Sequence, residues 1–418
     1  MGDFQNILIL FSFLIEVAVL FYLEIKAWNT LYTPLIFLML PYVIVLLISI
    51  AISGNFGFVE FHYPSILLWS VGLLIFALPS YVLAFILQKH NYPLSSTIAE
   101  IGMPKLLISA SLIIILLFLW RFKSVVGTFP IGSSEFGEIF SGKGLWGHLR
   151  QLSLPLLIMA IYFVDKEKKW LWGIIVSLLI VGLLYNVLGW IVIPCFAGIT
   201  LRLYSGKTKL KLSLVLYVLL GVSAVFLGSY LLTLVLAEDS ELNNEVLSFI
   251  FRNFVHYLTS GTLGLSVDME YGFPDVGEFD KLIAQMINIV NKIIGKDEIA
   301  GFLNPLYYNT GFNYTNVRTL FGTIYINTNK ISFALYVLFL STMMYLTKLA
   351  TIRFNNIFVY SIFFFGCGLL FMGWFDSYFA CLAVVEIPVL CLVLLLLCEM
   401  CKPKLTIGQI QDNAVEKI

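Results

Sequence analysis

Runs of about 17–25 apolar residues recur along the whole length of this chain, and they decide what it can fold into. A helix of that length crosses the hydrocarbon core of a bilayer, which is about 30 Å thick, with its backbone hydrogen bonds made internally. Over 418 residues the chain is 60% hydrophobic and 12% charged, whereas a soluble domain carries about 25% charged residues. The sequence therefore predicts an all-α polytopic membrane protein.

The apolar runs predict about eleven transmembrane helices and one large outward loop that contains amphipathic helices. The first eight spans lie in residues 1–236, the loop in residues 237–330, and the last three spans with a short cytoplasmic tail in residues 331–418. The sixth and seventh runs form either a hairpin that turns at Tyr185-Asn186 or one tilted helix followed by a re-entrant piece. The predicted spans are residues 5–23, 34–53, 66–87, 105–121, 148–164, 170–186, 188–202, 211–236, 331–347, 357–373 and 378–400.

The positions of lysine and arginine predict the orientation of these spans. Basic residues collect in short loops near residues 166–169, 202–211, 348–353 and 402–404. All four loops fall on one side of the membrane if the sixth and seventh runs form a hairpin, and basic loops mark the cytoplasmic side. The large loop, residues 122–147 and the turn at residues 374–377 then face outward, and the C-terminus lies inside. The first apolar run lacks the features of a signal peptide, so we expect it to be a retained span.

Several functions are disfavoured by what the sequence lacks. The net charge is zero, so nothing points to a nucleic-acid partner. The sequence contains no G-x-x-x-x-G-K-[ST], H-E-x-x-H or G-x-S-x-G motif. It has only four histidines, and no second cysteine pair completes a metal site with Cys398 and Cys401. We therefore expect no metal site and no ATP-driven pump on this chain.

The stretch from Asn244 to Thr259 predicts a helix with a basic stripe. Ser248, Arg252 and His256 recur every four residues and so project from one helix face. Such a helix is expected to lie at the outer surface of the bilayer. A guanidinium offers a two-pronged donor to phosphate oxygens, and an imidazole adds a second donor or a titratable group. The alternative is a solvated polar face on a loop helix.

A second cation, Arg318, lies shortly before the ninth span. We expect Thr315 or Asn316 to cap a helix here, with Arg318 in its first turn. A positive charge at a helix N-terminus opposes the macrodipole by up to about 1 kcal/mol, which a bound anion would relieve. The alternative is an interfacial anchor whose charge reaches water.

Five further residues complete the expected site. Lys143 lies in the outer region 122–147, and His148 and Arg150 follow at the mouth of the fifth span; the three are expected to form a positive rim around an outward cleft. Asp268 and Glu270 are the candidate bases of the large loop, with solvated loop carboxylates as the alternative.

Two carboxylates, Glu16 and Glu386, fall inside predicted spans. A charge at the bilayer centre costs at least about 2.5–3.5 kcal/mol. Each of the two therefore marks a proton or substrate path, or packs inside the bundle as a neutral carboxyl.

The layout and two sequence stretches resemble the O-antigen polymerase (Wzy-type) family. In that family the outer loop is followed by an N-V-x-T-x-F-G-x-x-Y stretch, and here the matching residues run from Asn316 to Tyr325. Residues Tyr257 to Gly264 are similar to the aromatic, glycine-containing stretch that follows a loop arginine in the family. The family's Ser-Arg pair at a break between mid-chain spans has no counterpart in residues 185–188, which lack the arginine.

The resemblance implies a metal-independent glycosyltransferase of the bacterial cytoplasmic membrane, without a cofactor, that polymerises lipid-linked oligosaccharide repeat units of O-antigen or a capsule. The donor would be a chain on undecaprenyl pyrophosphate, and a chain-length regulator is a candidate partner. Cations beside the departing pyrophosphate would lower the barrier, and a base would take the proton of the acceptor hydroxyl. The candidate catalytic residues are Arg252, His256, Arg318, Asp268 and Glu270, and the candidate substrate-binding residues are Arg150, Lys143, His148, Tyr257 and Asn316.

Two other functions fit parts of this pattern. A transporter or flippase of a lipid-linked glycan is favoured by Glu16 and Glu386, but it is disfavoured by polar residues that concentrate outside the spans. An O-antigen ligase would have a similar layout and would transfer the glycan to an acceptor lipid.

Overall fold

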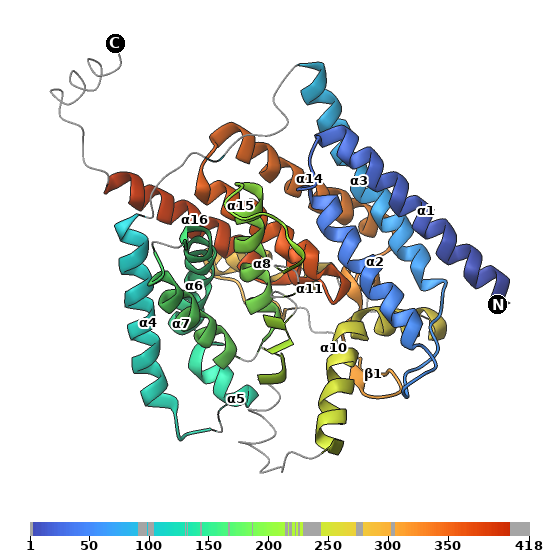
Figure 1. The fold of residues 1–418 in the computed structure, drawn as a ribbon, viewed down its shortest axis with the longest axis horizontal. Coiled ribbons are helices and arrows are strands. Elements are labelled where there is room, and N and C mark those ends of the chain that lie inside the picture. The colour runs from blue at the N-terminus through green and yellow to red at the C-terminus, as the bar shows by residue number, and fades with distance from the viewer. Residues whose placement is uncertain are drawn as a thin grey trace.

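The computed structural model describes residues 3–90, 98, 104–129, 131, 133–142, 144–165, 168–185, 187–213, 216, 220–221, 223–224, 226–228, 244–272, 279–301 and 306–401. These residues form a helical bundle with one small antiparallel hairpin (Figure 1). The longer helices are α1 (Asp3–Trp28), α2 (Pro34–Ile52), α3 (Ser65–Lys89), α4 (Lys105–Val125), α6 (Gly144–Phe163), α7 (Leu171–Leu184), α8 (Gly189–Tyr204), α10 (Asn244–Tyr271), α12 (Ala284–Ile294), α14 (Lys330–Phe354), α15 (Ile357–Phe371) and α16 (Ala383–Met400). The shorter elements are α5 (Ser134–Gly137), the π-helix η1 (Glu138–Gly142), α11 (Phe279–Leu282), β1 (Tyr308–Asn309), β2 (Tyr314–Thr315), α13 (Thr319–Ile326), η2 (Met372–Trp374) and η3 (Tyr378–Ala380).

Seven helical segments in the described part of the chain are long and apolar enough to cross a membrane: α1, α2, α3, α4, α14, α16 and Ile357–Trp374, which joins α15 to η2. Each coincides with a predicted span, and α6, α7 and α8 coincide with the fifth, sixth and seventh. The chain breaks around Tyr185, between α7 and α8, where the hairpin turn is predicted. The eighth predicted span, residues 211–236, lies largely outside the described residues.

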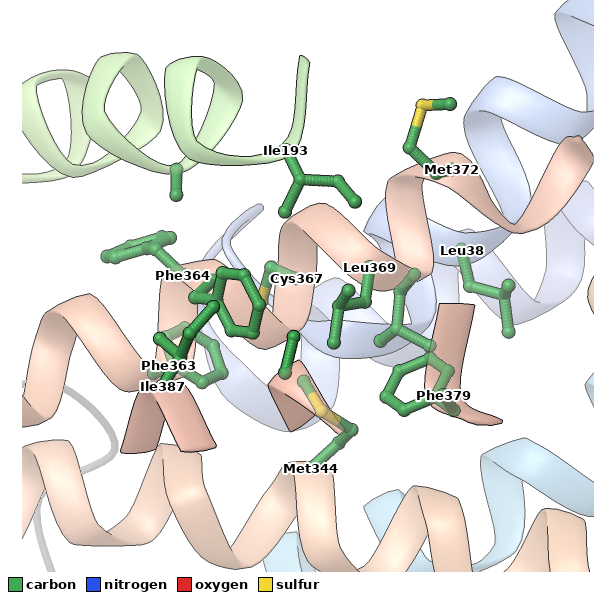
Figure 2. Packing of buried hydrophobic residues seen from close by; sticks show 14 of the residues in the cluster. Leu38, Ile193, Met344, Phe363, Phe364, Cys367, Leu369, Met372, Phe379 and Ile387 are labelled. Carbon is green, nitrogen blue, oxygen red and sulfur yellow. The ribbon is translucent and has the colours of Figure 1, made fainter. Parts of the chain in front are cut away.

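Helix α15 forms the centre of the bundle. Its residues are apolar on all sides, which is typical of a helix enclosed by others, and it packs against α2, α8, α14 and α16. A methyl group at Gly366 would lie 2.8 Å from Met344 Cε, and one at Gly368 would lie 2.9 Å from the Ile193 carbonyl oxygen. The two glycines therefore let α14 and α8 approach α15 closely. Figure 2 shows this packing around Phe363, Phe364, Cys367 and Leu369, with Leu38, Ile193, Met344 and Ile387 contributed by neighbouring helices.

Helix α10 departs from the helix expected at the membrane surface. It continues to Tyr271, and every residue from Thr259 to Asp268 is buried. This half of the helix is rich in serine, threonine and glycine, so other backbones can approach it closely. A side chain at Gly261 would overlap the carbonyl oxygens of Trp374 and Phe375, and one at Gly264 would overlap that of Val317. The helical spacing therefore predicted the helix correctly, but it did not predict that other parts of the protein cover its second half.

Substitution of Gly261 by alanine is expected to destabilise the fold by about 1–3 kcal/mol, because the added methyl group meets fixed backbone atoms. The measurement is the melting temperature of the detergent-purified protein. The matched control is Gly173→Ala in α7, where an added methyl group has nothing within 4 Å. That variant should melt at or above the parent temperature, since alanine favours a helix by about 0.5–1 kcal/mol over glycine. Equal melting temperatures for both variants would refute the tight contact at Gly261.

Candidate anion-binding site

The side chain of Arg318 is fully buried and forms an ion pair with a carboxylate of α10. Its Nε donates to Asp268 Oδ2, its Nη1 to the Asn316 carbonyl at 2.8 Å, and its Nη2 to the Leu306 carbonyl at 3.0 Å. The guanidinium also lies over the ring of Tyr308. Burial raises the pKa of the Asp268 carboxyl, and the Arg318 guanidinium opposes that rise. The pair ties α10 to the segment that precedes α13.

Arg318 also occupies the N-cap position of α13, which begins at Thr319. The expected cap at Thr315 or Asn316 is therefore wrong, and the Thr315 hydroxyl instead accepts from the Val317 amide at 3.2 Å. A positive charge beside a helix N-terminus favours a nearby anion. Here that anion is the Asp268 carboxylate of the protein itself. The alternative of an interfacial anchor is also wrong, because no part of Arg318 reaches water.

Arg252 and His256 share one face of α10, as their spacing predicts, and both contact Phe312. The Arg252 guanidinium carbon lies 4.1 Å from the centre of the Phe312 ring, and Nη2 donates to the Phe56 carbonyl at 2.8 Å. His256 is buried, and its Nδ1 lies 3.1 Å from the Thr310 hydroxyl. Through Arg252 and His256 this face of α10 packs on the loop after α2 and on the β-hairpin, while Ser248, one turn earlier, is exposed.

The surroundings of His256 predict a pH dependence of stability. Burial lowers the pKa of His256 below the ordinary histidine value of about 6.5, so the folded protein favours the neutral imidazole. The unfolded chain takes up the proton first as pH falls. The contribution of His256 to stability is therefore fully present above about pH 6.5 and is lost as pH falls through the folded pKa.

When the pH is lowered from about 7.5 to about 5.5, the melting temperature of the parent protein is expected to fall further than that of a His256→Asn variant. Asparagine keeps a polar atom near the Thr310 hydroxyl but cannot take up a proton. Identical pH slopes for the two proteins would show that His256 does not titrate in this way.

Arg252 and Arg318 do not share a pocket. Arg318 pairs with Asp268, which lies about 24 Å beyond Arg252 along the continuous helix α10, at 1.5 Å per residue. One diphosphate cannot contact both guanidinium groups at that separation. The expectation that these two arginines together stabilise one leaving group is therefore wrong, and the described residues offer a different arginine for that role.

Arg150, near the start of α6, is only 7% exposed. Its guanidinium stacks on the ring of Tyr185, with 3.6 Å between Cζ and the ring centre. Its Nε and Nη1 are buried and have no hydrogen-bond partner within the described ranges. An unpaired buried donor costs about 1–3 kcal/mol, and more when it is charged, so this group favours an acceptor from outside. Arg150 thus brings a cation to the break between α7 and α8, where the sequence itself lacks one.

His148 lies one half-turn before Arg150 and contacts the first turn of α16. Its Nδ1 is 2.7 Å from Glu386 Oε1, and the imidazole is otherwise largely exposed. In the neutral imidazole with its proton on Nδ1, this carboxylate accepts from Nδ1 and the lone pair is on Nε2, which can then accept a proton. Glu386 also lies within electrostatic reach of Arg150. The three side chains form one group, which we call the Arg150 group, at the joined ends of α6 and α16.

The turn between α15 and α16 contacts α13 on one side. The Thr319 amide donates to the Phe375 carbonyl at 3.0 Å, and the Thr323 hydroxyl donates to Asp376 Oδ1 at 2.5 Å. Burial raises the pKa of Asp376, and the hydrogen bonds from Thr323 and the Ser377 amide oppose the rise. Asp376 is therefore held in place beside the N-terminal part of α13.

The same turn reaches the Arg150 group on its other side. Cys381 lies within electrostatic reach of both Asp376 and Arg150. Tyr378 packs so closely on α8 that any side chain at Gly189 would overlap its ring. Asp376 in turn lies within electrostatic reach of Arg318, so this turn adjoins both the Arg150 group and the buried pair of Arg318 and Asp268.

The remaining predicted residues are spread over these surroundings. The ring of Tyr257 packs on Phe375, with 4.6 Å between ring centres, and Asn316 gives its carbonyl to Arg318. Glu270 is exposed near the end of α10, away from the Arg318 side chain that its neighbour Asp268 contacts. Lys143 lies outside the described residues.

Sequence reasoning missed the roles of Asp376 and Tyr308. Asp376 did carry a signal, because it is an acidic residue in a short turn between two strongly apolar runs. Tyr308 carried none, since nothing in the sequence indicates that its ring covers the guanidinium of Arg318.

The long apolar helices of the described residues define a multi-pass helical membrane protein, and buried polar groups lie among these helices. Residues 57–404 match a family of unknown function, DUF6337. Because this match covers most of the length of the chain, the chain belongs to this family. No curated protein and no solved structure matches the chain.

Proposed function

We propose that this protein is a glycosyltransferase that joins lipid-linked oligosaccharide repeat units at the outer face of a bacterial cytoplasmic membrane. The donor is a growing polysaccharide chain on undecaprenyl pyrophosphate, and the acceptor is a single lipid-linked repeat. The chain would cross the membrane about eleven times, with residues 237–330 outside and the C-terminus in the cytoplasm. The resemblance of residues Asn316 to Tyr325 to the O-antigen polymerases supports the substrate class.

The observation that carries this proposal is the buried guanidinium of Arg150, whose Nε and Nη1 have no hydrogen-bond partner among the described residues. A guanidinium donates to phosphate oxygens in its own plane, and Nε and Nη1 lie on two different edges of that plane. The stack on Tyr185 fixes the plane. In the expected orientation the start of α6, the start of α16 and the α7–α8 break all face outward. A diphosphate headgroup would therefore meet Arg150 at the outer leaflet.

The Arg150 group contains the parts that the transfer requires. His148 Nε2 takes the proton of the acceptor hydroxyl while Glu386 holds the imidazole through Nδ1. The hydroxyl oxygen forms a bond to the anomeric carbon of the donor sugar, and the bond from that carbon to the diphosphate oxygen breaks. The diphosphate leaves with the bonding electrons, and Arg150 stabilises its growing charge. No metal is needed in this scheme.

The proposal is tested in a strain from which the gene is deleted. Single repeats should accumulate on the lipid carrier at the outer leaflet while long polymer disappears, and the purified protein with lipid-linked repeats should restore a ladder of chain lengths. Absence of repeats from the outer leaflet would instead identify a flippase. Long polymer that forms but stays on its carrier lipid would identify a ligase. Normal ladders in the deleted strain would reject all three.

A further inference from the structure

Helix α12 carries an apolar stripe that the described protein leaves uncovered. Its exposed residues follow helical spacing, and the fraction exposed rises to 54% at Val290 and 79% at Ile293. Only Ala284 among the residues of α12 is buried. The stripe is formed by Met286, Ile289, Val290, Ile293 and Ile294.

The polar side of α12 is occupied by its own connecting segment. Asn288 exchanges hydrogen bonds of 2.7 Å with both backbone groups of Ile299, and Asn291 donates to the Asp297 carbonyl at 3.0 Å. These bonds fold residues 296–299 back over the polar face. The apolar stripe lies on the side of α12 opposite to this segment, and its residues are exposed.

The location of α12 indicates what covers the stripe. In the preceding helix α11, Leu282 is fully buried and the Phe279 ring lies 6.2 Å from that of Tyr336. Tyr336 lies about 9 Å inside the start of α14, at 1.5 Å per residue. Helix α14 is long and apolar enough to cross a membrane, and its neighbouring residues Ile331 and Leu335 are exposed. The α11–α12 unit thus lies at the depth where a spanning helix meets the bilayer surface.

We propose that α12 is an in-plane anchor whose apolar stripe enters the acyl boundary of the lipid leaflet at the N-terminal end of α14. An amphipathic helix buries such a face about 5–10 Å into the headgroup and acyl boundary. The nearby charges, Lys292, Lys296, Asp297 and Glu298, balance one another. Burial of apolar surface, rather than attraction to anionic headgroups, therefore holds this helix at the membrane. The inference is independent of the glycosyltransferase chemistry.

The test uses a spin label on the full-length protein in lipid nanodiscs. Labels are attached at Ile293→Cys and, as the matched control, at Lys292→Cys, both in a Cys401→Ser background that removes the exposed native thiol. The label at position 293 should collide more often with oxygen, which concentrates in lipid, than with a water-soluble nickel chelate. The label at position 292 should show the opposite order. Elution volume and melting temperature confirm that each variant is folded.

Three results would overturn the anchor. A label at position 293 that meets the nickel chelate as often as the control label does would place the stripe in water. A label at position 293 that is shielded from both reagents would mean that protein covers the stripe. A position 293 label that moves from shielded to oxygen-accessible on dilution of the protein into empty lipid would identify a second copy of the chain as that cover, and would likewise reject the lipid anchor.

Discussion

Replacement of Arg150 by glutamine is expected to slow repeat-unit joining about 10²–10³-fold, comparable with the removal of one preorganised donor from a site where charge develops. Glutamine keeps two N–H donors but loses the positive charge that faces the leaving diphosphate. Arg150→Lys should recover only part of the rate, because an ammonium keeps the charge and lacks the planar fork that stacks on Tyr185. The measurement is the initial rate of ladder formation with purified protein and lipid-linked repeats.

A catalytic role and a structural role for Arg150 predict different patterns. In the catalytic role the glutamine variant loses activity but melts near the parent temperature, because the loss of the stack on Tyr185 is offset by the removal of two buried donors without partners in the described ranges. A matched control is Arg121→Gln in α4, since Arg121 also stacks on an aromatic ring, that of Trp146, and donates to the Ile139 carbonyl. The control variant should keep the parent rate. A glutamine variant at position 150 that melts lower and joins repeats at the parent rate would remove Arg150 from the chemistry.

Replacement of Asp268 by alanine is expected to lower the free energy of unfolding by about 3–5 kcal/mol, because it leaves the buried guanidinium of Arg318 without its counter-charge. The double variant Asp268→Leu with Arg318→Met should recover most of that loss, since apolar residues of similar volume often replace a buried pair at little cost. Thermal unfolding in detergent at neutral pH measures both effects. A single variant as stable as the parent would show that the pair does not hold α10 in place.

The positions of the spanning helices could be predicted from the sequence because the bilayer itself imposes them. A run such as residues 357–373 has one low-energy outcome in lipid, a helix with its backbone groups satisfied internally. The surroundings of α10 could not be predicted in the same way. Helical spacing shows which residues share a face, but it does not show whether lipid, water or another helix covers that face.

The candidate site could be predicted in its residue types and not in its groupings. Arg150, His148 and Glu386 were each singled out, but their meeting depends on how α6 and α16 pack, which no local pattern encodes. The sequence predicts that Arg318 binds an anion from outside the protein, whereas the carboxylate of Asp268, fifty residues earlier, is the anion that it binds. The missing arginine at the mid-chain break illustrates the same limit, because the fold provides that cation from the preceding helix.

The glycine contacts of α10 have a consequence for biosynthesis. Gly261 is covered by carbonyl groups of residues 374 and 375, which leave the ribosome more than a hundred residues later. Until residues 374 and 375 have emerged, the surface of α10 around Gly261 lacks this cover, although Thr262 already has Ser49 of α2 as a hydrogen-bond partner. Maturation of this protein therefore finishes from its C-terminal end, and chains that stop before α15 should be targets for membrane quality-control proteases.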